Sequence, residues 1–220
     1  LLKSYWLIFL GVNLMKFISD NGIRKFLVIP DSADRILFLD EKFKLRSEIT
    51  PYNVAIKSVL GTKANSNDKD MQKKDEHLVR IFDVIFLTGR DLYAFSASDH
   101  SITICREQGG VGNRKATHVL YNRLYHGLLH LKLCWSESQS ILCSVADNRV
   151  IYGWDIDKPL PIFQVSRHSD IVTDFICCDS LDMFITCAMD KKIVMWSSIT
   201  RRVKGILMGH RRVLRCLSAF

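Results

Sequence analysis

Three side chains in the C-terminal third of the sequence have the types that a hydrolase triad needs: His168, Thr186 and Asp190. In such a site an imidazole removes the proton from a hydroxyl nucleophile, while a carboxylate orients the imidazole. The nucleophile must also be presented at a cleft by a sharp turn, and the sequence contains no Gly-x-Ser-x-Gly motif. The same residue types can form a buried structural network, because buried polar side chains need hydrogen-bond partners.

A metal site is the second chemistry to consider. The stretch YHGLLHLKLC contains His126, His130 and Cys134 at intervals of four, which puts them on one face of either a helix or a strand. No fourth ligand is evident, so packing or loop positions are favoured. Residues 109–112 (GGVG) are not followed by Lys-Ser or Lys-Thr, and residues 31–41 lack the alternating Asp and central Gly of a calcium loop. We expect no catalytic residue, no metal ion and no cofactor.

Basic residues are concentrated near the C-terminus. The net charge is +8, and residues 191–220 contain eight basic residues and no acidic one. The candidates for binding an acidic partner are Arg201, Arg202, Lys204, Arg211 and Arg212. Aromatic residues do not interleave with them, which argues against single-stranded nucleic acid. The alternative is a solvated rim whose compensating acidic residues lie outside this sequence.

Several landmarks recur at an interval of 42 residues, beginning with Trp154 and Trp196. The other pairs are Ser144 and Thr186, Asn148 and Asp190, His126 and His168, and His168 and His210. A fixed period of this length is typical of a repeat protein in which each unit is one supersecondary structure. The repeat therefore favours a structural role for the three triad-like residues.

The last full unit divides into four short apolar runs separated by polar turns. The runs are 171–177, 183–189, 193–196 and 199–208, with turns at 179–182 and 190–192. Alternation with a period of two over such short runs predicts strands and hairpins. Four antiparallel strands in about 42 residues are one blade of a β-propeller.

With these landmarks the sequence resembles the WD-repeat β-propeller family, whose units carry Gly-His near the start and Trp-Asp at the end of the third strand. In that family a His, a Ser or Thr, an Asp and a Trp form a hydrogen-bonded structural tetrad. The resemblance assigns such tetrads to His168, Thr186, Asp190 and Trp196, and to His126, Ser144, Asn148 and Trp154. Because Asn148 stands where the family usually has Asp and carries no charge, we expect the second tetrad to be weaker.

The pattern weakens toward the N-terminus. His77 and Asp99 keep the same interval of 22 residues as His168 and Asp190, but Cys105 stands at the tryptophan position. The expected organisation is one or more degenerate blades at 1–60, a polar loop insertion at 61–76, a degenerate blade at 77–125, WD repeats at 126–167 and 168–209, and the first strand of a further blade at 210–220. The expected fold class is therefore all-β, with about four blades of a larger ring that commonly has seven in this family.

Two further features bear on location. The apolar run 5–15 is too short to span a bilayer, which needs about 20 residues, so we expect a buried strand pair and no membrane contact. Seven cysteines without a Cys-x-x-Cys pair favour free thiols in a reducing compartment, hence the cytoplasm. Degenerate repeats with inserted loops also occur in large cytoskeletal or ciliary members of the family, which adds a weak expectation of that kind.

The resemblance implies a non-catalytic scaffold that binds other proteins through its loops, although a fold alone does not give a function. It also implies that the loop after Gly209-His210, with Arg211 and Arg212, lies on the face used for partners. The alternative function is a binding module for acidic or phosphorylated partners, or for nucleic acid, through the basic residues. A third hypothesis is an enzyme whose active site lies in another domain.

Overall fold

The computed structural model describes residues 12–20, 23–30, 32–50, 79–108 and 117–218 of the 220-residue chain. His77 and the polar stretch 61–76 lie outside these residues, so what the sequence predicts for them stays a prediction. The described residues form 16 strands and one 3-10 helix of three residues, Asp179–Leu181. None of them belongs to a helix that is long and apolar enough to cross a bilayer.

The strands form four antiparallel sheets, and each sheet is built from four strands that are consecutive in sequence. The first sheet contains β1 (Val12–Asp20), β2 (Ile23–Pro30), β3 (Ile36–Leu39) and β4 (Leu45–Ile49). The second contains β5 (Ile81–Leu87), β6 (Leu92–Ala97), β7 (Ser101–Gln108) and β8 (Thr117–Tyr125). The third contains β9 (His130–Ser136), β10 (Ile141–Ala146), β11 (Ile151–Trp154) and β12 (Pro161–Val165). The fourth contains β13 (Val172–Cys178), β14 (Met183–Ala188), β15 (Ile193–Ser197) and β16 (Val203–Leu207).

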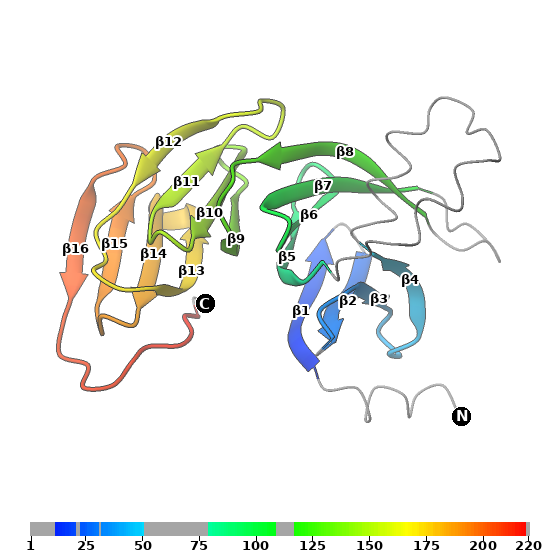
Figure 1. Ribbon diagram of the computed structural model, residues 1–220, viewed down its shortest axis with the longest axis horizontal. Helices are drawn as coiled ribbons and strands as arrows, with labels where there is room; N and C mark the ends of the chain where they lie inside the picture. The colour runs from blue at the N-terminus through cyan, green and yellow to red at the C-terminus, as the bar shows by residue number, and fades with distance from the viewer. Residues whose placement is uncertain (1–11, 21–22, 31, 51–78, 109–116, 219–220) are drawn as a thin grey trace.

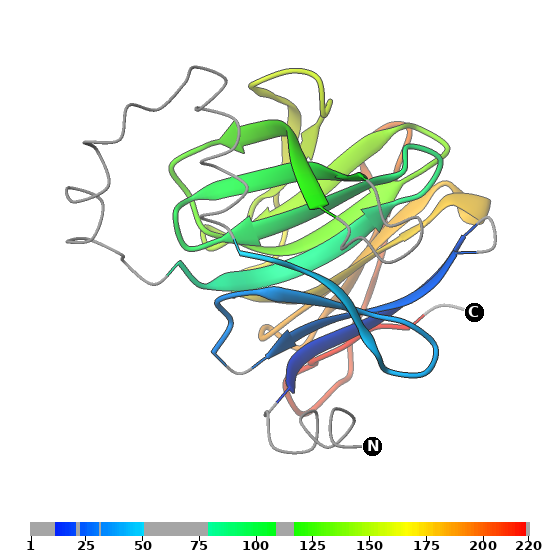
Figure 2. The ribbon, with the colours of Figure 1, turned by 90° about the vertical axis from the view of Figure 1, so that its right-hand side faces the viewer.

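The four sheets follow one another around an arc (Figure 1). The first strand of each sheet lies on the inner side of the arc and the fourth strand on the outer side. Figure 2 views the arc from the side of the first and second sheets, whose twisted strands lie one above the other. Four-stranded meanders placed side by side in this way are propeller blades. The predicted all-β fold with four-stranded antiparallel blades is confirmed.

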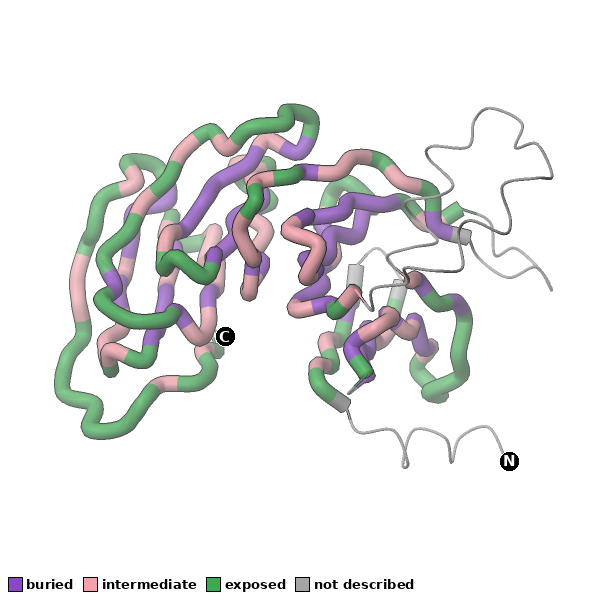
Figure 3. The backbone as a smooth tube through the Cα atoms, in the orientation of Figure 1, coloured by how far each residue is buried: buried purple, intermediate pink, exposed green. Residues whose placement is uncertain are grey.

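The apolar core lies between neighbouring sheets. One cluster of buried side chains joins the first and second sheets, another the second and third, and another the third and fourth. Buried residues therefore concentrate on the inner and middle strands, while most turns are exposed or half-buried (Figure 3). All residues of β6 and β11 are buried, because these middle strands are covered on both faces. The outer strand β12 instead alternates between half-buried and exposed residues.

One glycine is required by the close approach of two strands in the third sheet. Gly153 on β11 lies opposite Phe163 on β12, and a Cβ atom on Gly153 would lie 1.9 Å from Cε1 of the Phe163 ring. We expect Gly153→Ala to displace that ring and to lower the free energy of unfolding by about 1–3 kcal/mol, as overpacking does. Urea denaturation measures the change.

The fourth sheet supplies a matched control for this glycine. There the pair is reversed, with Met195 on β15 opposite Gly205 on β16. A Cβ on Gly205 would meet only the flexible end of the Met195 side chain, at 2.8 Å. Gly205→Ala should therefore cost clearly less, and an equal cost for both variants would contradict this account of Gly153.

Two expectations about the ends of the sequence need correction. Of the apolar run 5–15, residues 5–11 lie outside the described residues, and Met15 on β1 is exposed and not buried. The segment 210–218 is not a strand as expected, because its backbone pairs with no other strand among the described residues. It runs instead along β13, where Thr173 Oγ1 donates to the carbonyl of Leu214 (2.8 Å) and the amide of Leu217 donates to Asp174 (2.7 Å).

Candidate functional site

The four tetrad residues of the fourth sheet form a continuous chain of hydrogen bonds. Trp196 Nε1 donates to Thr186 Oγ1 (3.0 Å), which lies 2.8 Å from Nε2 of His168. Nδ1 of the same ring lies 3.0 Å from Asp190 Oδ2. A neutral imidazole protonated on Nδ1 satisfies the chain, because it donates to the carboxylate and accepts from the Thr186 hydroxyl. Two adjacent strands, the turn between them and the loop before β13 thus hold one another in register.

The same geometry explains why these residues resemble a catalytic triad in sequence. His168, Thr186 and Asp190 have the order of contacts that a hydroxyl nucleophile, its base and the orienting carboxylate would have. Thr186, however, is 0% exposed and its oxygen already accepts from Trp196. A substrate carbonyl has no path to that oxygen, so the arrangement can hold a fold but cannot attack an ester or amide.

Asp190 is the anchor of this network. Burial raises its pKa, but hydrogen bonds from His168 and from the amides of Ser169 and Lys192 outweigh burial and hold the pKa below its usual value. The carboxylate is therefore ionised at neutral pH and fixes both the loop before β13 and the turn between β14 and β15.

The corresponding residues of the third sheet are only partly joined. Trp154 Nε1 donates to Ser144 Oγ (2.7 Å), as in the fourth sheet. Asn148 instead donates to the hydroxyl of Tyr152 (2.8 Å), and the His126 ring lies edge-on to Tyr152 with centroids 4.5 Å apart. No hydrogen bond joins His126 to Ser144 or Asn148 in this fully described sheet, so the expected four-membered tetrad is reduced to one pair.

The difference between the tetrads of the third and fourth sheets comes from Tyr152, which the sequence shows at the position of Val194. Ser144 pairs with Tyr152 across the strands, whereas Thr186 pairs with Val194. Tyr152 therefore brings a hydroxyl to a place where the fourth sheet has an apolar side chain, and Asn148 bonds to it. Asn148 in place of Asp, together with Tyr152 in place of an apolar residue, is the sequence signal that could have predicted this altered hydrogen-bond network.

In the second sheet, apolar side chains stand at two of the tetrad positions. By strand register, Phe95 and Cys105 of the second sheet take the places of Thr186 and Trp196, and both are buried. Asp99 occupies the turn position as expected, but it pairs with Arg123 (2.9 Å) and Ser101 (2.7 Å). Apolar side chains need no hydrogen-bond partners, so in the second sheet Phe95 and Cys105 contribute packing, while Asp99 bonds outside any tetrad.

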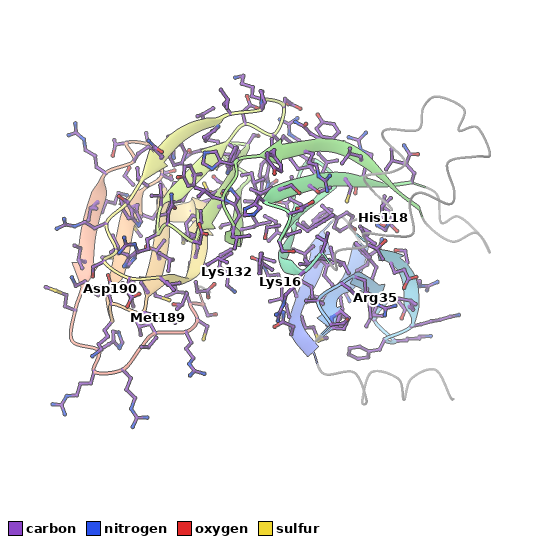
Figure 4. All side chains as sticks on the ribbon, in the orientation of Figure 1. Lys16, Arg35, His118, Lys132, Met189 and Asp190 are labelled. Carbon is purple, nitrogen blue, oxygen red and sulfur yellow. The ribbon has the colours of Figure 1, made fainter. Side chains whose placement is uncertain are left out.

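Carboxylates also join neighbouring sheets. Asp83 on β5 is buried, receives the amide of Leu133 on β9 (2.9 Å) and pairs with Lys16 on β1 (2.6 Å). Figure 4 places Lys16 and Lys132 on the inner strands of the arc. The same bond recurs after the fourth sheet, where Asp174 on β13 accepts the amide of Leu217 as Asp83 on β5 accepts the amide of Leu133 on β9. The C-terminal segment therefore lies where the inner strand of a next sheet would lie, although it forms no ladder.

Arg201, a predicted binding residue, is instead part of the contact between the third and fourth sheets. Its guanidinium lies 4.2 Å from the centroid of the Phe163 ring and donates to Gln139 (2.8 Å). Burial lowers its pKa, against the opposing influence of the Cys143 and Cys177 thiols. Arg201 is half-buried and held in this contact by the aromatic ring, so its guanidinium is less free than those of the exposed basic residues, and its binding to a partner stays a prediction.

Of the three residues considered for metal binding, His130 is buried and Cys134 is half-buried. Cys134, Cys143 and Cys177 cluster between the third and fourth sheets, where burial and the other two thiols raise the pKa of Cys177. All seven cysteines are free thiols. Among the residues described, no group of three or more His, Cys, Asp or Glu is arranged to hold a metal ion.

The remaining basic candidates divide between the two ends of the fourth sheet. Arg202 and Lys204 are exposed near the β15–β16 turn, where Lys204 donates to the carbonyl of Leu181 (3.3 Å). Arg211 and Arg212 are exposed beyond the opposite end of β16, after His210. These four residues therefore lie at opposite ends of β16.

Two solved structures are similar to this fold: U3-55K and the WD40 repeats of RRP9. They are 15% and 14% identical to this chain over 61% of its length, each with a TM-score of 0.50. This chain covers 43% of each of those chains, so it spans less than half of their length. No protein-family model and no curated protein matches the sequence. The likeness shows that these four sheets have the WD40-repeat propeller fold.

Proposed function

We propose that this chain is a non-catalytic scaffold of the WD-repeat type that holds other proteins in an assembly through its exposed rims. The observation that carries the proposal is the enclosed tetrad, because the side chains with catalytic types are buried and saturated with hydrogen bonds. The exposed residues include many of the turns at both ends of the sheets, which a rigid set of blades holds in fixed positions (Figure 3). Propeller folds with these properties bind partners in general, which supports a role in protein binding.

The working compartment is part of the same proposal. We place the protein in the cytoplasm, and the seven free thiols support a reducing environment. We retain a larger propeller ring as a proposal as well, supported by the inner-strand position of the segment 211–218.

The scaffold role can be tested with the full 220-residue chain. We expect the purified chain to bind at least two different proteins in fixed stoichiometry. Charge reversal of the basic residues at one end of the fourth sheet should abolish binding of one of them and not of the other. We also expect a fluorophosphonate probe to leave Thr186 unmodified in peptide mass spectra. Covalent labelling of Thr186, or a chain that recovers no protein under conditions where it is folded, would contradict the proposal.

A further inference from the structure

One end of the fourth sheet exposes apolar and basic side chains together. Three segments meet there: the loop before β13, the β14–β15 turn and the chain that follows β16 (Figure 1). The first two are joined, since the amide of Met189 donates to the carbonyl of Ile171 (2.9 Å). The third runs from Met208 back to β13, where Leu214 is bound by Thr173. We call this end the lower rim, and Figure 4 labels Met189 and Asp190 on it.

The apolar side chains of the lower rim are large and exposed. They are Ile171, Met189, Met208 and Val213, of which Met208 is 73% exposed. A single exposed apolar residue is ordinary in a soluble protein, whereas several of them on adjacent loops are typical of an interaction surface.

The cations of the lower rim have no carboxylate partner within this part of the structure. They are Lys191, Lys192, Arg211 and Arg212, and none of the ion pairs among the described residues includes any of them. The nearby Asp190 is engaged by His168 inside the tetrad, and Asp170 accepts the amide of Ile171. These four cations outnumber the two carboxylates, so the rim keeps an excess of positive charge.

We propose that the lower rim is the docking surface for an acidic peptide segment of a partner protein that carries apolar side chains between its carboxylates. Arginine pairs with carboxylates through two parallel hydrogen bonds, and the exposed methionines can adapt to varied apolar side chains. Single-stranded nucleic acid is typically bound by cations together with aromatic stacking platforms, and no aromatic residue other than His210 lies beside the two pairs of loop cations. The inference rests on the proposed scaffold role and names the chemistry of one partner.

The test uses the full 220-residue chain and a fluorescein-labelled peptide made of three copies of Glu-Asp-Leu-Glu-Phe. Binding is followed by fluorescence anisotropy at several salt concentrations. A second peptide with Gln and Asn in place of Glu and Asp keeps the apolar side chains, and a labelled single-stranded RNA of similar length represents the nucleic-acid alternative. We expect saturable binding of the acidic peptide only.

Two charge-reversal variants distinguish binding at the lower rim from a general effect of the net charge of the protein. Arg211→Glu with Arg212→Glu should weaken peptide binding by at least about tenfold, since each exposed pair is lost and replaced by repulsion. Arg202→Glu with Lys204→Glu makes the same change of charge at the opposite end of the sheet and should change the affinity by less than about twofold. Met189→Ser with Met208→Ser should weaken binding while leaving its salt dependence unaltered.

The outcomes are distinct. The proposal is overturned if both charge-reversal variants lose binding equally, if the amide peptide binds as well as the acidic one, or if RNA binds more tightly than either peptide. Thermal denaturation of each variant shows whether it is folded. A chain that binds no acidic peptide but still recovers other proteins would sink this inference and leave the scaffold role intact.

Discussion

Trp196→Ala is expected to lower the free energy of unfolding by about 3–5 kcal/mol, the range for truncating a large buried aromatic side chain. The Trp196 side chain is 3% exposed and packs in the cluster between the third and fourth sheets. Its loss leaves a cavity in that cluster and removes the donor on which Thr186 depends. Urea denaturation followed by far-UV circular dichroism measures the change.

A second substitution separates packing from hydrogen bonding at the same position. Trp196→Phe keeps most of the apolar contact but removes the indole N–H, so it should cost about 1–2 kcal/mol, the range for a lost buried hydrogen bond with partial packing loss. Trp154→Ala should also be costly, because that ring is fully buried and bonds to Ser144. A loss below about 1 kcal/mol for Trp196→Ala would contradict the structural role of the tetrad.

Acidification from about pH 6.5 to pH 4 is expected to reduce stability by about 3 kcal/mol through His130 alone, since each pKa unit corresponds to about 1.4 kcal/mol. Burial lowers the pKa of His130 from 6.5 to about 4, with further lowering by His126 and His100. The ring is 1% exposed, and neither nitrogen has a hydrogen-bond partner within the described structure. The unfolded chain therefore binds the proton more readily than the folded chain between these two pH values.

Stability falls as the pH falls because the folded protein favours the neutral form of His130. Above about pH 6.5 the imidazole is neutral in both states and the stabilisation is complete, whereas it is lost as the pH falls toward 4. His130→Phe keeps a planar ring of similar size and should flatten the stability profile over this window. The measurement is urea denaturation of both proteins at half-unit pH steps, and parallel profiles for the two would contradict the assignment.

The strand pattern and the repeat were available from the sequence because they are local. Alternation over short runs identified the hairpins at 95–105 and 183–196, and the interval of 42 residues identified the tetrad positions of the fourth sheet. In middle strands such as β6, apolar and polar residues do not alternate clearly, because both faces of the strand are buried and apolar side chains suit either face. Their placement depended on the turns around them.

The networks between sheets could not be obtained in the same way. Asp83 gave no sign that it would receive the amide of Leu133, 50 residues away, because such contacts depend on how two sheets pack. His126 stood at the correct interval for a tetrad, yet the Tyr152 hydroxyl took Asn148 as its partner. An interval in the sequence fixes where a residue lies along a strand, but the side chains facing it decide which bonds it makes.

The sequence alone determined that this protein is built from four-stranded antiparallel blades, because strand alternation and turn chemistry act over a few residues. Only the tertiary structure decided which basic residues remain available. Arg201 and Arg211 look alike in the sequence, but one guanidinium stacks on Phe163 between two sheets and the other is exposed on the lower rim. The physical reason is that burial is a property of surfaces brought together from distant segments, so the spacing of charges along the chain cannot specify it.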